Sequence, residues 1–149
     1  PLYGNGGEGV FLISSNDINL NQIIENFIST SKEHFIVQKY LPEIIKGDKR
    51  IILVDGKPVG AISRVPKVNE IRSNIHVGGS ARKISISKSD KIICDIIGPE
   101  LRKQKLFFVG IDIIGKYLIE INVTSPTCIR EIKELSKIDI AKIIWDKLV

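Results

Sequence analysis

The chain has 149 residues, enough for one domain or two small lobes around a real hydrophobic core, and its formal net charge is +5. Acidic residues are interspersed with the basic ones, and aromatic residues in basic surroundings are scarce, so we expect no nucleic-acid partner. No apolar run approaches the roughly 20 residues that a membrane span needs, so we expect no membrane partner either.

The N-terminal segment is rich in glycine: Gly4, Gly6, Gly7 and Gly9 precede the apolar run VFLIS, which we predict to be a strand. Because glycine has no Cβ, such a loop lets backbone N–H groups approach a phosphate closely. The segment is neither a P-loop nor a Rossmann fingerprint, since no Gly-Lys-Ser/Thr follows and a strand comes next. A phosphate-binding loop and a plain flexible turn are both open at this point.

The next elements are a helix and a strand. Apolar residues at helical spacing predict a helix over residues 17–31, with Asn16 or Asp17 as its N-cap. Residues 34–41, which read HFIVQKYL, predict a strand that ends at Pro42.

Residues 47–65 predict a β-hairpin whose turn is Asp55-Gly56. Asp48 and Arg50 begin its first strand, and because they are two residues apart they share a face. Arg64 lies near the end of the second strand. Each of these charges is either part of a site or an exposed residue at a strand end.

Residues 66–80 show no clean periodicity and carry proline, asparagine and glycine residues besides Arg72. A segment this long without a regular element is either disordered or a functional lid. His76 is the only histidine in this segment, and a lone histidine in a loop is usually a solvated side chain.

A helix is predicted over residues 89–105, and Pro99 should kink or break it near Gly98. Asp139 can cap a last helix. The two cysteines, Cys94 and Cys128, are far apart and have no histidines at ligand spacing, which favours free thiols in a reducing, cytoplasmic setting.

The apolar runs 107–114 and 118–123 flank a short, glycine-containing break and predict a hairpin with a three-residue loop. That loop sets Asp112 opposite Glu120, so one face of the hairpin is apolar and the other carries Asp112, Glu120 and Asn122. Two carboxylates and an amide are hard oxygen donors of the kind that suits Mg²⁺ or Mn²⁺. The alternative is a solvated outer face.

Together these motifs resemble the ATP-grasp ligases: a glycine loop before a strand, a Gln-x-Tyr-Leu strand end, an Asp-x-Arg strand, a long lid and a late Asp…Glu-x-Asn. The stretch EINVTSPTCIRE, with VGIDIIG before it, is similar to bacterial glutathione synthetases in particular. GDKRI, RVP and the pattern ExRxNxxxGG match that family too. The resemblance covers nearly the whole chain, and its last motif is specific.

The resemblance implies an α+β, ATP-grasp fold, in which two small lobes with antiparallel sheets and flanking helices clamp ATP. Residues 1–41 would be part of the ATP-clamping small lobe, and residues 42–149 the larger catalytic lobe with its lid at 66–80. In that family a nucleotide-contacting lysine and a whole N-terminal domain precede the glycine loop. Both are absent from this chain, so its activity by itself is an open question.

The resemblance also implies roles for individual residues. The magnesium ligands would be Asp112, Glu120 and Asn122. The nucleotide-binding residues would be Gly6, Gly7, Gln38, Lys39, Tyr40, Leu41, Asp48 and Arg64. The catalytic residues would be Arg50, Arg72 and Gly78. The substrate-binding residues would be Arg72, Asn74, Ser125, Pro126 and Thr127.

The activity implied is that of an ATP-dependent ligase that joins glycine to γ-glutamylcysteine through an acyl phosphate, releasing ADP and phosphate. Its cofactor would be Mg²⁺ or Mn²⁺, and the full-length protein would be a homo-oligomer, a dimer or tetramer. Two alternatives are another ATP-grasp ligase, acting with D-alanine or on a protein tail, and a non-catalytic ATP-binding module. The SPTCIRE segment and the lid favour the glutathione enzyme over the first, whereas the missing lysine and N-terminal domain favour the second for this chain alone.

Overall fold

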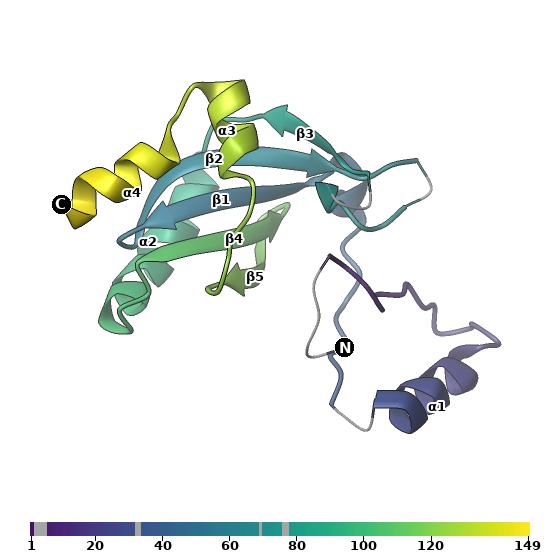
Figure 1. Cartoon of the computed structure of the whole chain (residues 1–149). Helices are drawn as coiled ribbons and strands as arrows, with labels where there is room; N and C mark the ends of the chain where they lie inside the picture. Colours follow the sequence, from purple (N-terminus) through teal and green to yellow (C-terminus); the bar gives the residue numbers. More distant parts are fainter. Residues whose placement is uncertain (2–5, 32–33, 69, 76–77) are drawn as a thin grey trace.

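The computed structural model describes residues 1, 6–31, 34–68, 70–75 and 78–149. Its five strands form one antiparallel sheet in the order β3-β2-β1-β4-β5, and helices cover both faces (Figure 1). The α+β class that the sequence predicts is therefore confirmed. No helix among these residues is long and apolar enough to cross a membrane.

The centre of the sheet is the hairpin of β1 (Asp48–Val54) and β2 (Lys57–Val65). Its turn is Asp55-Gly56, as predicted, and these residues have positive φ angles of 53° and 65°. Two positive φ angles are typical of a type I′ turn, whose twist matches that of the strands it joins. Strand β1 lies between β2 and β4, and residues 51–54 are fully buried because both faces of the sheet are covered.

Two hydrophobic cores lie on opposite faces of the sheet. Helix α2 (Lys88–Lys103) packs on one face, and α3 (Ile129–Ser136) and α4 (Ile140–Leu148) pack on the other. The buried residues of the first core are Ile51, Leu53, Ala61, Cys94, Leu101, Val109, Ile111 and Ile113. Those of the second are Ile52, Val54, Ile62, Cys128, Ile132 and Ile140. Neighbouring residues of β1 thus point into different cores, as strand geometry requires.

The hairpin of β4 (Phe108–Ile114) and β5 (Tyr117–Asn122) has the predicted pairing of Asp112 with Glu120 but not the predicted loop. Its strands close on a two-residue turn, with Ile114 opposite Tyr117. The register then shifts by one residue, so that Ile113 faces Leu118 but Asp112 faces Glu120. A β-bulge of this kind places an extra residue in one strand. The bulge, rather than a longer loop, therefore gives the two carboxylates a common face.

The apolar face predicted for this hairpin, which comprises Ile111, Ile113, Ile119, Ile121 and Val123, is only partly buried. Ile111 and Ile113 on β4 are fully buried, whereas Ile121 and Val123 are 42% and 46% exposed. Strand β5 is at the edge of the sheet, so one side of it has no neighbouring strand within the described residues.

Helix α2 continues through Pro99, so the helix does not break at Gly98, and a kink there stays a prediction. Ser87 caps the helix in a reciprocal capping box with Asp90, which shares in both hydrogen bonds. Cys94 and Leu101, on either side of the proline, are both buried against the sheet. Packing on both sides thus offsets the roughly 3 kcal/mol that an interior proline costs a helix.

Gly98 lets α2 approach the β1–β2 turn closely, and Gly98→Ala should therefore destabilise the fold. A Cβ on Gly98 would lie 2.3 Å from the carbonyl oxygen of Gly56, which is backbone and cannot rotate away. Overpacking costs about 1–3 kcal/mol, whereas alanine gains at most about 1 kcal/mol in helix propensity. Thermal unfolding should show a lower Tm, while Ile96→Ala on the exposed side of α2 should change it little. An unchanged Tm for Gly98→Ala would contradict this account.

The N-terminal segment contains a helix but no strand among its described residues. Helix α1 (Leu20–Ser31) begins three residues later than predicted, and Asp17 accepts a hydrogen bond from the backbone of Asn19 just before it. The strands predicted at 10–14 and 34–41 are wrong: both segments lack ladder partners. Apolar alternation alone does not make a strand, because the backbone groups need a neighbouring strand to bond. The division into lobes at residue 41 stays a prediction.

Aromatic contacts link the N-terminal extended segments to α1. The ring of Phe27 lies 6.0 Å from that of Phe11 and 5.3 Å from that of Phe35, between centroids. Other apolar side chains of these segments stay exposed, such as Val37 at 84%. The 3₁₀ helix η1 (Pro42–Lys46) then leads into β1.

The C-terminal part adds one short strand and one helix that the sequence did not predict. Strand β3 (Ser80–Lys83) pairs with β2, and α3 follows a left-handed residue, Cys128, at φ 83°. The predicted cap of α4 is confirmed, since Asp139 accepts a hydrogen bond from the backbone of Lys142 at 3.1 Å. Helix α3 could have been recognised from its apolar residues at positions 129, 132 and 135.

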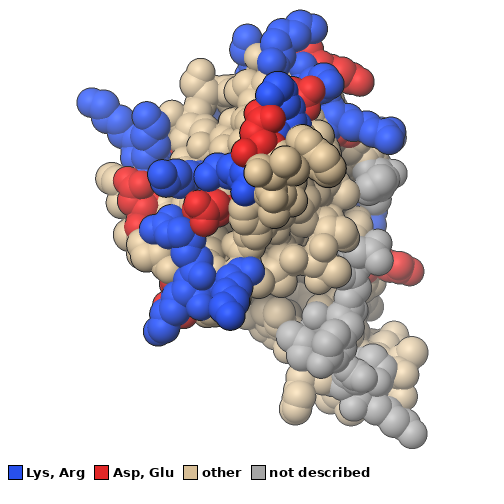
Figure 2. Space-filling model, turned by 60° about the vertical axis from the view of Figure 1, so that its left-hand side comes forward, with Lys and Arg blue, Asp and Glu red and all other residues tan. Residues whose placement is uncertain are grey.

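Basic side chains on the face shown in Figure 2 lie among acidic ones. Helix α4 makes two exposed ion pairs, Lys142 with Asp146 at 2.6 Å and Lys147 with Asp55 at 3.5 Å. Such exposed pairs contribute at most about 1 kcal/mol each.

Candidate functional site

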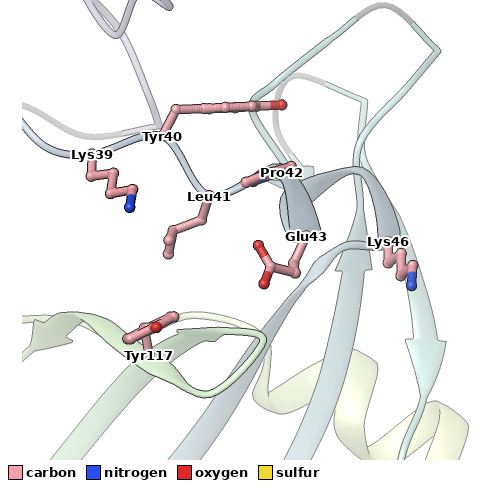
Figure 3. Close-up of a pocket in the computed structure, with 7 residues that line it drawn as sticks. All are labelled: Lys39, Tyr40, Leu41, Pro42, Glu43, Lys46 and Tyr117. Carbon is pink, nitrogen blue, oxygen red and sulfur yellow. The ribbon is translucent and has the colours of Figure 1, made fainter.

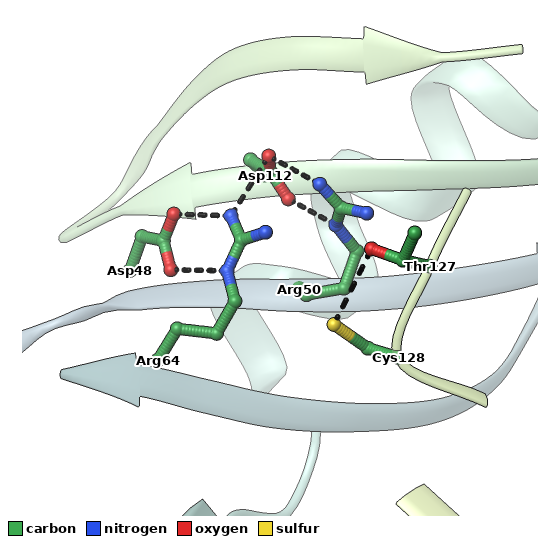
Figure 4. Close-up of polar contacts among 6 residues, drawn as sticks. All are labelled: Asp48, Arg50, Arg64, Asp112, Thr127 and Cys128. Atoms are coloured by element: carbon green, nitrogen blue, oxygen red, sulfur yellow. Dashed lines mark hydrogen bonds and ion pairs between the residues drawn. The ribbon is translucent and has the colours of Figure 1, made fainter. Parts of the chain in front are cut away.

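Four charged residues of β1, β2 and β4 form a buried cluster, the Asp-Arg quartet: Asp48, Arg50, Arg64 and Asp112 (Figure 4). Strand pairing creates it, since Asp48 lies opposite Arg64 and Arg50 lies opposite Asp112. Arg50 donates to Asp112 through Nε and Nη2, at 2.5 and 2.8 Å. Arg64 donates to both carboxylate oxygens of Asp48, and its Nη2 lies 2.9 Å from Oδ2 of Asp112. The two guanidinium groups are thus fixed by carboxylates on neighbouring strands.

The quartet is almost completely removed from solvent, with exposures of 2% to 4%. Burial alone would raise the pKa of Asp112, but the hydrogen bond from Arg50 and the charge of Arg64 outweigh burial and hold this pKa below its ordinary value. Burial alone would lower the pKa of Arg64, but hydrogen bonds and charge from Asp48 and Asp112 raise it. Asp112 and Arg64 therefore both stay charged at neutral pH.

Glu120 brings a second carboxylate beside the quartet. It lies opposite Asp112 on β5, and its side chain is partly exposed. Burial of the carboxyl group raises the pKa of Glu120, and the negative charge of Asp112 raises it further, against a smaller effect of the two arginines. Two adjacent carboxylates repel each other, so a bound cation would stabilise the ionised pair.

Asn122 completes the predicted metal set. It lies opposite Gly110, two residues along β5 from Glu120, and its buried Nδ2 has no hydrogen-bond partner in the described part of the chain. Rotation of the amide by half a turn would present Oδ1 at the same place. The unsatisfied amide is therefore suited to become an oxygen ligand.

The donors present fit a hard cation. Asp112 accepts three contacts from the arginines, which leaves one of its roughly four acceptor positions available. With Glu120 and the amide of Asn122, this gives the all-oxygen set that Mg²⁺ prefers. No group of three or more His, Cys, Asp and Glu that could hold a metal exists among the described residues, so a site here depends on the asparagine.

The glycine loop contacts the lid. Gly7 has a φ of 77°, and a Cβ at this position would lie 3.0 Å from Cδ of Arg72 and 3.3 Å from Oδ1 of Asn74. A side chain here would be strained and would also push the loop away from the lid. Gly6 has open space around its Cβ position within the described structure. Three of the predicted site residues, Gly7, Arg72 and Asn74, are thus brought together.

Within the lid, Arg72 is held by an ion pair with Glu70, a residue that was not among the predicted site residues. Glu70 accepts from Nε of Arg72 at 3.1 Å and from its Nη2 at 2.6 Å. Gly78 lies near Lys67, whose Cε would be 2.1 Å from a Cβ on the glycine. Positions 69, 76 and 77 of the lid, His76 among them, and Gly4 of the glycine loop lie outside the described residues.

A cavity of about 480 Å³ lies between the segment before β1 and the tip of the β4–β5 hairpin (Figure 3). Three of the predicted nucleotide residues line it, Lys39, Tyr40 and Leu41, whereas Gln38 does not. Its other lining residues are Pro42, Glu43, Lys46 and Tyr117. Tyr117 could not be found from the sequence, because it joins this cavity through the pairing of distant segments. The cavity has the size of small-molecule sites.

The predicted peptide-binding segment runs beside Arg50. A Cβ on Gly110 would lie 2.7 Å from Cβ of Pro126 and 3.3 Å from Cδ of Arg50, so both residues flank this glycine. Ser125 and Thr127 are exposed, whereas Pro126 is buried. The hydroxyl of Thr127 lies 3.7 Å from Sγ of Cys128, and burial raises the pKa of that thiol (Figure 4).

The predicted site residues thus fall into groups rather than one continuous pocket. A second cavity, of about 350 Å³, lies between the glycine loop and the lid and is lined by Gly9, Val10, Phe11, Leu12, Glu70, Ile71 and Arg72. Neither of these two cavities is lined by the Asp-Arg quartet. Along the chain, η1 connects the segment before β1 to the strands of the quartet, and β2 leads from the quartet into the lid.

The sheet, the buried arginines and the strand-borne acids fit the ATP-grasp domain that the sequence motifs resemble. Residues 1–137 match the model of the family described as "Prokaryotic glutathione synthetase, ATP-grasp domain", and the chain belongs to this family. The resemblance inferred from the sequence motifs is thereby confirmed, as is the ATP-grasp fold.

The chain is also similar to curated proteins named glutathione synthetase. It is 52% identical over 146 residues to the one from Mesorhizobium japonicum, covering 98% of this chain and 47% of the relative. It is 51% identical over 148 residues to the one from Agrobacterium fabrum, covering 99% and 46%. The chain therefore spans about half the length of the curated relatives it matches.

Proposed function

We propose that the full-length protein is an ATP-dependent carboxylate–amine ligase, a glutathione synthetase that joins glycine to γ-glutamylcysteine. Similarity to relatives of that name, at 52% and 51% identity, supports the choice of substrates. The structural observation that supports the chemistry most is the Asp-Arg quartet with Glu120 opposite Asp112. It provides fixed positive charge and acidic metal donors at one place, as phosphoryl transfer needs.

The reaction would take place in two steps. The carboxylate of γ-glutamylcysteine would attack the γ-phosphorus of ATP, and the bond to ADP would break, giving an acyl phosphate. The amine of glycine would then attack the acyl carbon, lose its proton and expel phosphate. No covalent bond to the protein forms in either step, which suits a site without a positioned nucleophile.

The chain's own residues would bind and orient the reactants. Lys39, Tyr40 and Leu41 would hold the adenine, with Gln38 beside them, and the backbone of Gly6 and Gly7 would cover the phosphates. Arg50 and Arg72 would neutralise oxygens that gain charge in the transition state. Arg64 would contact the nucleotide. Asp48 would act through Arg64, because both of its carboxylate oxygens accept hydrogen bonds from that arginine.

The remaining assignments concern the metal and the peptide. Asp112, Glu120 and Asn122 would hold Mg²⁺ or Mn²⁺, which when bound supplies positive charge to phosphate oxygens. Asn74, Ser125, Pro126 and Thr127 would bind the peptide together with Arg72, and Gly78 would allow the lid backbone to approach the site. The enzyme would work as a homo-oligomer in the cytoplasm, where the buried Cys94 and Cys128 would stay reduced.

ADP release tests the proposed function. The full-length protein is mixed with ATP and Mg²⁺, and γ-glutamylcysteine and glycine are added singly and together. We expect stoichiometric ADP and glutathione only when both substrates are present. Turnover with D-alanine but not glycine would indicate a different ATP-grasp ligase, and ATP binding without turnover would indicate a non-catalytic module.

Closure of the lid should be detectable by limited proteolysis. Acyl phosphates hydrolyse readily, so residues 66–80 should close over the site and exclude water once nucleotide and peptide are bound. Cleavage within the lid should therefore slow strongly when both ligands are added, while cleavage elsewhere changes little. Equal cleavage rates with and without ligands would contradict a lid function.

A further inference from the structure

Three arginines of this chain are held by carboxylates in the same way. In each of them Nε and Nη2 together donate to the two oxygens of one carboxylate. The pairs are Arg50 with Asp112, Arg64 with Asp48, and Arg72 with Glu70. The three arginines are also the ones for which the proposed function requires contact with phosphate oxygens.

This shared geometry leaves the same part of each guanidinium available. A guanidinium is a rigid planar fork with five N–H donors, and a carboxylate on the Nε–Nη2 edge leaves the Nη1 end for another acceptor. Nη1 has no hydrogen-bond or ion-pair partner in any of the three arginines, within the part of the chain that the structure describes. For Arg50 and Arg64 these unpartnered ends can be seen in Figure 4.

Glu70 is itself fixed by the backbone. Besides Arg72, its Oε1 accepts hydrogen bonds from the backbone N–H groups of Ile71 at 2.9 Å and Arg72 at 3.1 Å. The hydrogen bonds from the side chain of Arg72, and to a smaller extent that from its backbone N–H, lower the pKa of Glu70 to about 2. The carboxylate is therefore charged throughout the neutral range, and it links the guanidinium to the lid backbone.

We propose that Glu70 is a positioning residue, which orients the guanidinium of Arg72 so that its Nη1 end meets the transferred phosphoryl group when the lid closes. The proposal rests on the proposed function and adds Glu70 to it. Within the sheet, Asp112 fixes the guanidinium of Arg50 and Asp48 fixes that of Arg64. Glu70 fixes the guanidinium of Arg72 in the same way within the lid. Without it, the long side chain of Arg72 would have to be ordered during closure, at a cost in rotamer entropy.

A purely local role is the competing explanation, in which Glu70 only fixes the backbone of the lid. Glu70→Gln separates the two explanations. Glutamine keeps the Oε1 acceptor for the backbone N–H groups, but its amide nitrogen is a donor and cannot accept from Nη2 of Arg72. The variant therefore breaks the two-point contact and keeps the backbone hydrogen bonds.

The experiment compares kcat and the equilibrium Kd for ATP in full-length Glu70→Gln, Arg72→Ala and the double variant. Glu70→Gln should lower kcat by about 10-fold, the lower end of what a residue that orients a functional group contributes, and should leave the Kd within about twofold. Because Glu70 acts through Arg72, the double variant should be no slower than Arg72→Ala alone. Glu100→Gln is the matched control: Glu100 is also hydrogen-bonded to a near neighbour, Gln104, but lies on α2.

The unmodified protein must first show ligase turnover, and absence of that turnover would contradict the proposed function. Once turnover is present, each outcome either supports or overturns the positioning role of Glu70. A kcat for Glu70→Gln equal to that of the control would overturn the positioning role. Additive losses in the double variant would also overturn it, because Glu70 would then act without Arg72. A lower Tm together with an equal loss of kcat and ATP affinity would assign Glu70 to the local backbone alone.

Discussion

Replacing Glu120 with glutamine should abolish Mg²⁺-dependent turnover of the full-length protein while leaving its fold intact. Glutamine has nearly the same shape and keeps one oxygen, but it removes the negative charge that lies opposite Asp112. A charged ligand lost from a catalytic metal site costs the transition state several kcal/mol, or about a thousandfold in rate. The fold should survive, because Glu120 lies on the edge strand β5 and its side chain is exposed.

The measurement is turnover as a function of Mg²⁺ concentration, together with thermal unfolding. Removal of the metal by a chelator should stop the unmodified protein and should have no further effect on Glu120→Gln. Glu134→Gln, an exposed glutamate on α3, is the control and should keep full activity. Unchanged activity of Glu120→Gln with an unchanged Mg²⁺ dependence would remove Glu120 from the metal set.

The position of Glu120 was predictable because strand alternation leaves few choices. A register that mixed Glu120 with Ile111 and Ile113 would bury a charge among residues that are fully buried. The bulge that produces the register was not predictable, because a longer loop and a two-residue turn with a bulge give the same pairing. The hydrophobic pattern therefore determines which residues share a face, but not how the chain achieves it.

Arg64 faces Asp48 within the predicted hairpin of β1 and β2, although a register shift at Ile52 and Leu53 sets the exact pairing. The pairing of Arg50 with Asp112 was not predictable from the sequence, because it depends on β4 lying beside β1. That strand order is a long-range property, which no local pattern contains. Glu70, in contrast, is two residues from Arg72, and its role could have been inferred from the ExRxN stretch itself.

The N-terminal segment shows the opposite error, in which a local pattern indicated more structure than forms. Phe11 and Val37 lie in apolar runs of strand-like composition, yet they are 62% and 84% exposed and their segments join no sheet. A strand gains stability only when a neighbouring strand bonds its backbone and a surface covers its apolar face. Composition can indicate the capacity for a strand, but the partner decides whether it forms.

Arg72→Ala in the full-length protein should lower kcat by about 100-fold or more and leave ATP affinity nearly unchanged. Arg72 lies in the lid, where Glu70 holds one edge of its guanidinium and Gly7 lies beside its aliphatic part. It would therefore reach the phosphoryl group only on closure, so its charge acts chiefly on the transition state. Removal of one preorganised donor to developing negative charge costs about 10²–10³ in kcat. An interaction made only in the transition state lowers kcat and kcat/KM together.

Two further variants make the prediction specific to the guanidinium of Arg72. Arg72→Lys should recover only part of the lost rate, because an ammonium group cannot contact a carboxylate and a phosphoryl group with two fixed edges. Arg82→Ala, at an exposed arginine on β3 just beyond the lid, should behave like the unmodified protein. Steady-state kinetics are measured beside equilibrium ATP binding. Weakened ATP binding with a normal kcat at saturation would assign Arg72 to nucleotide capture, because a charge that acts only after closure cannot contribute to the affinity of the open state.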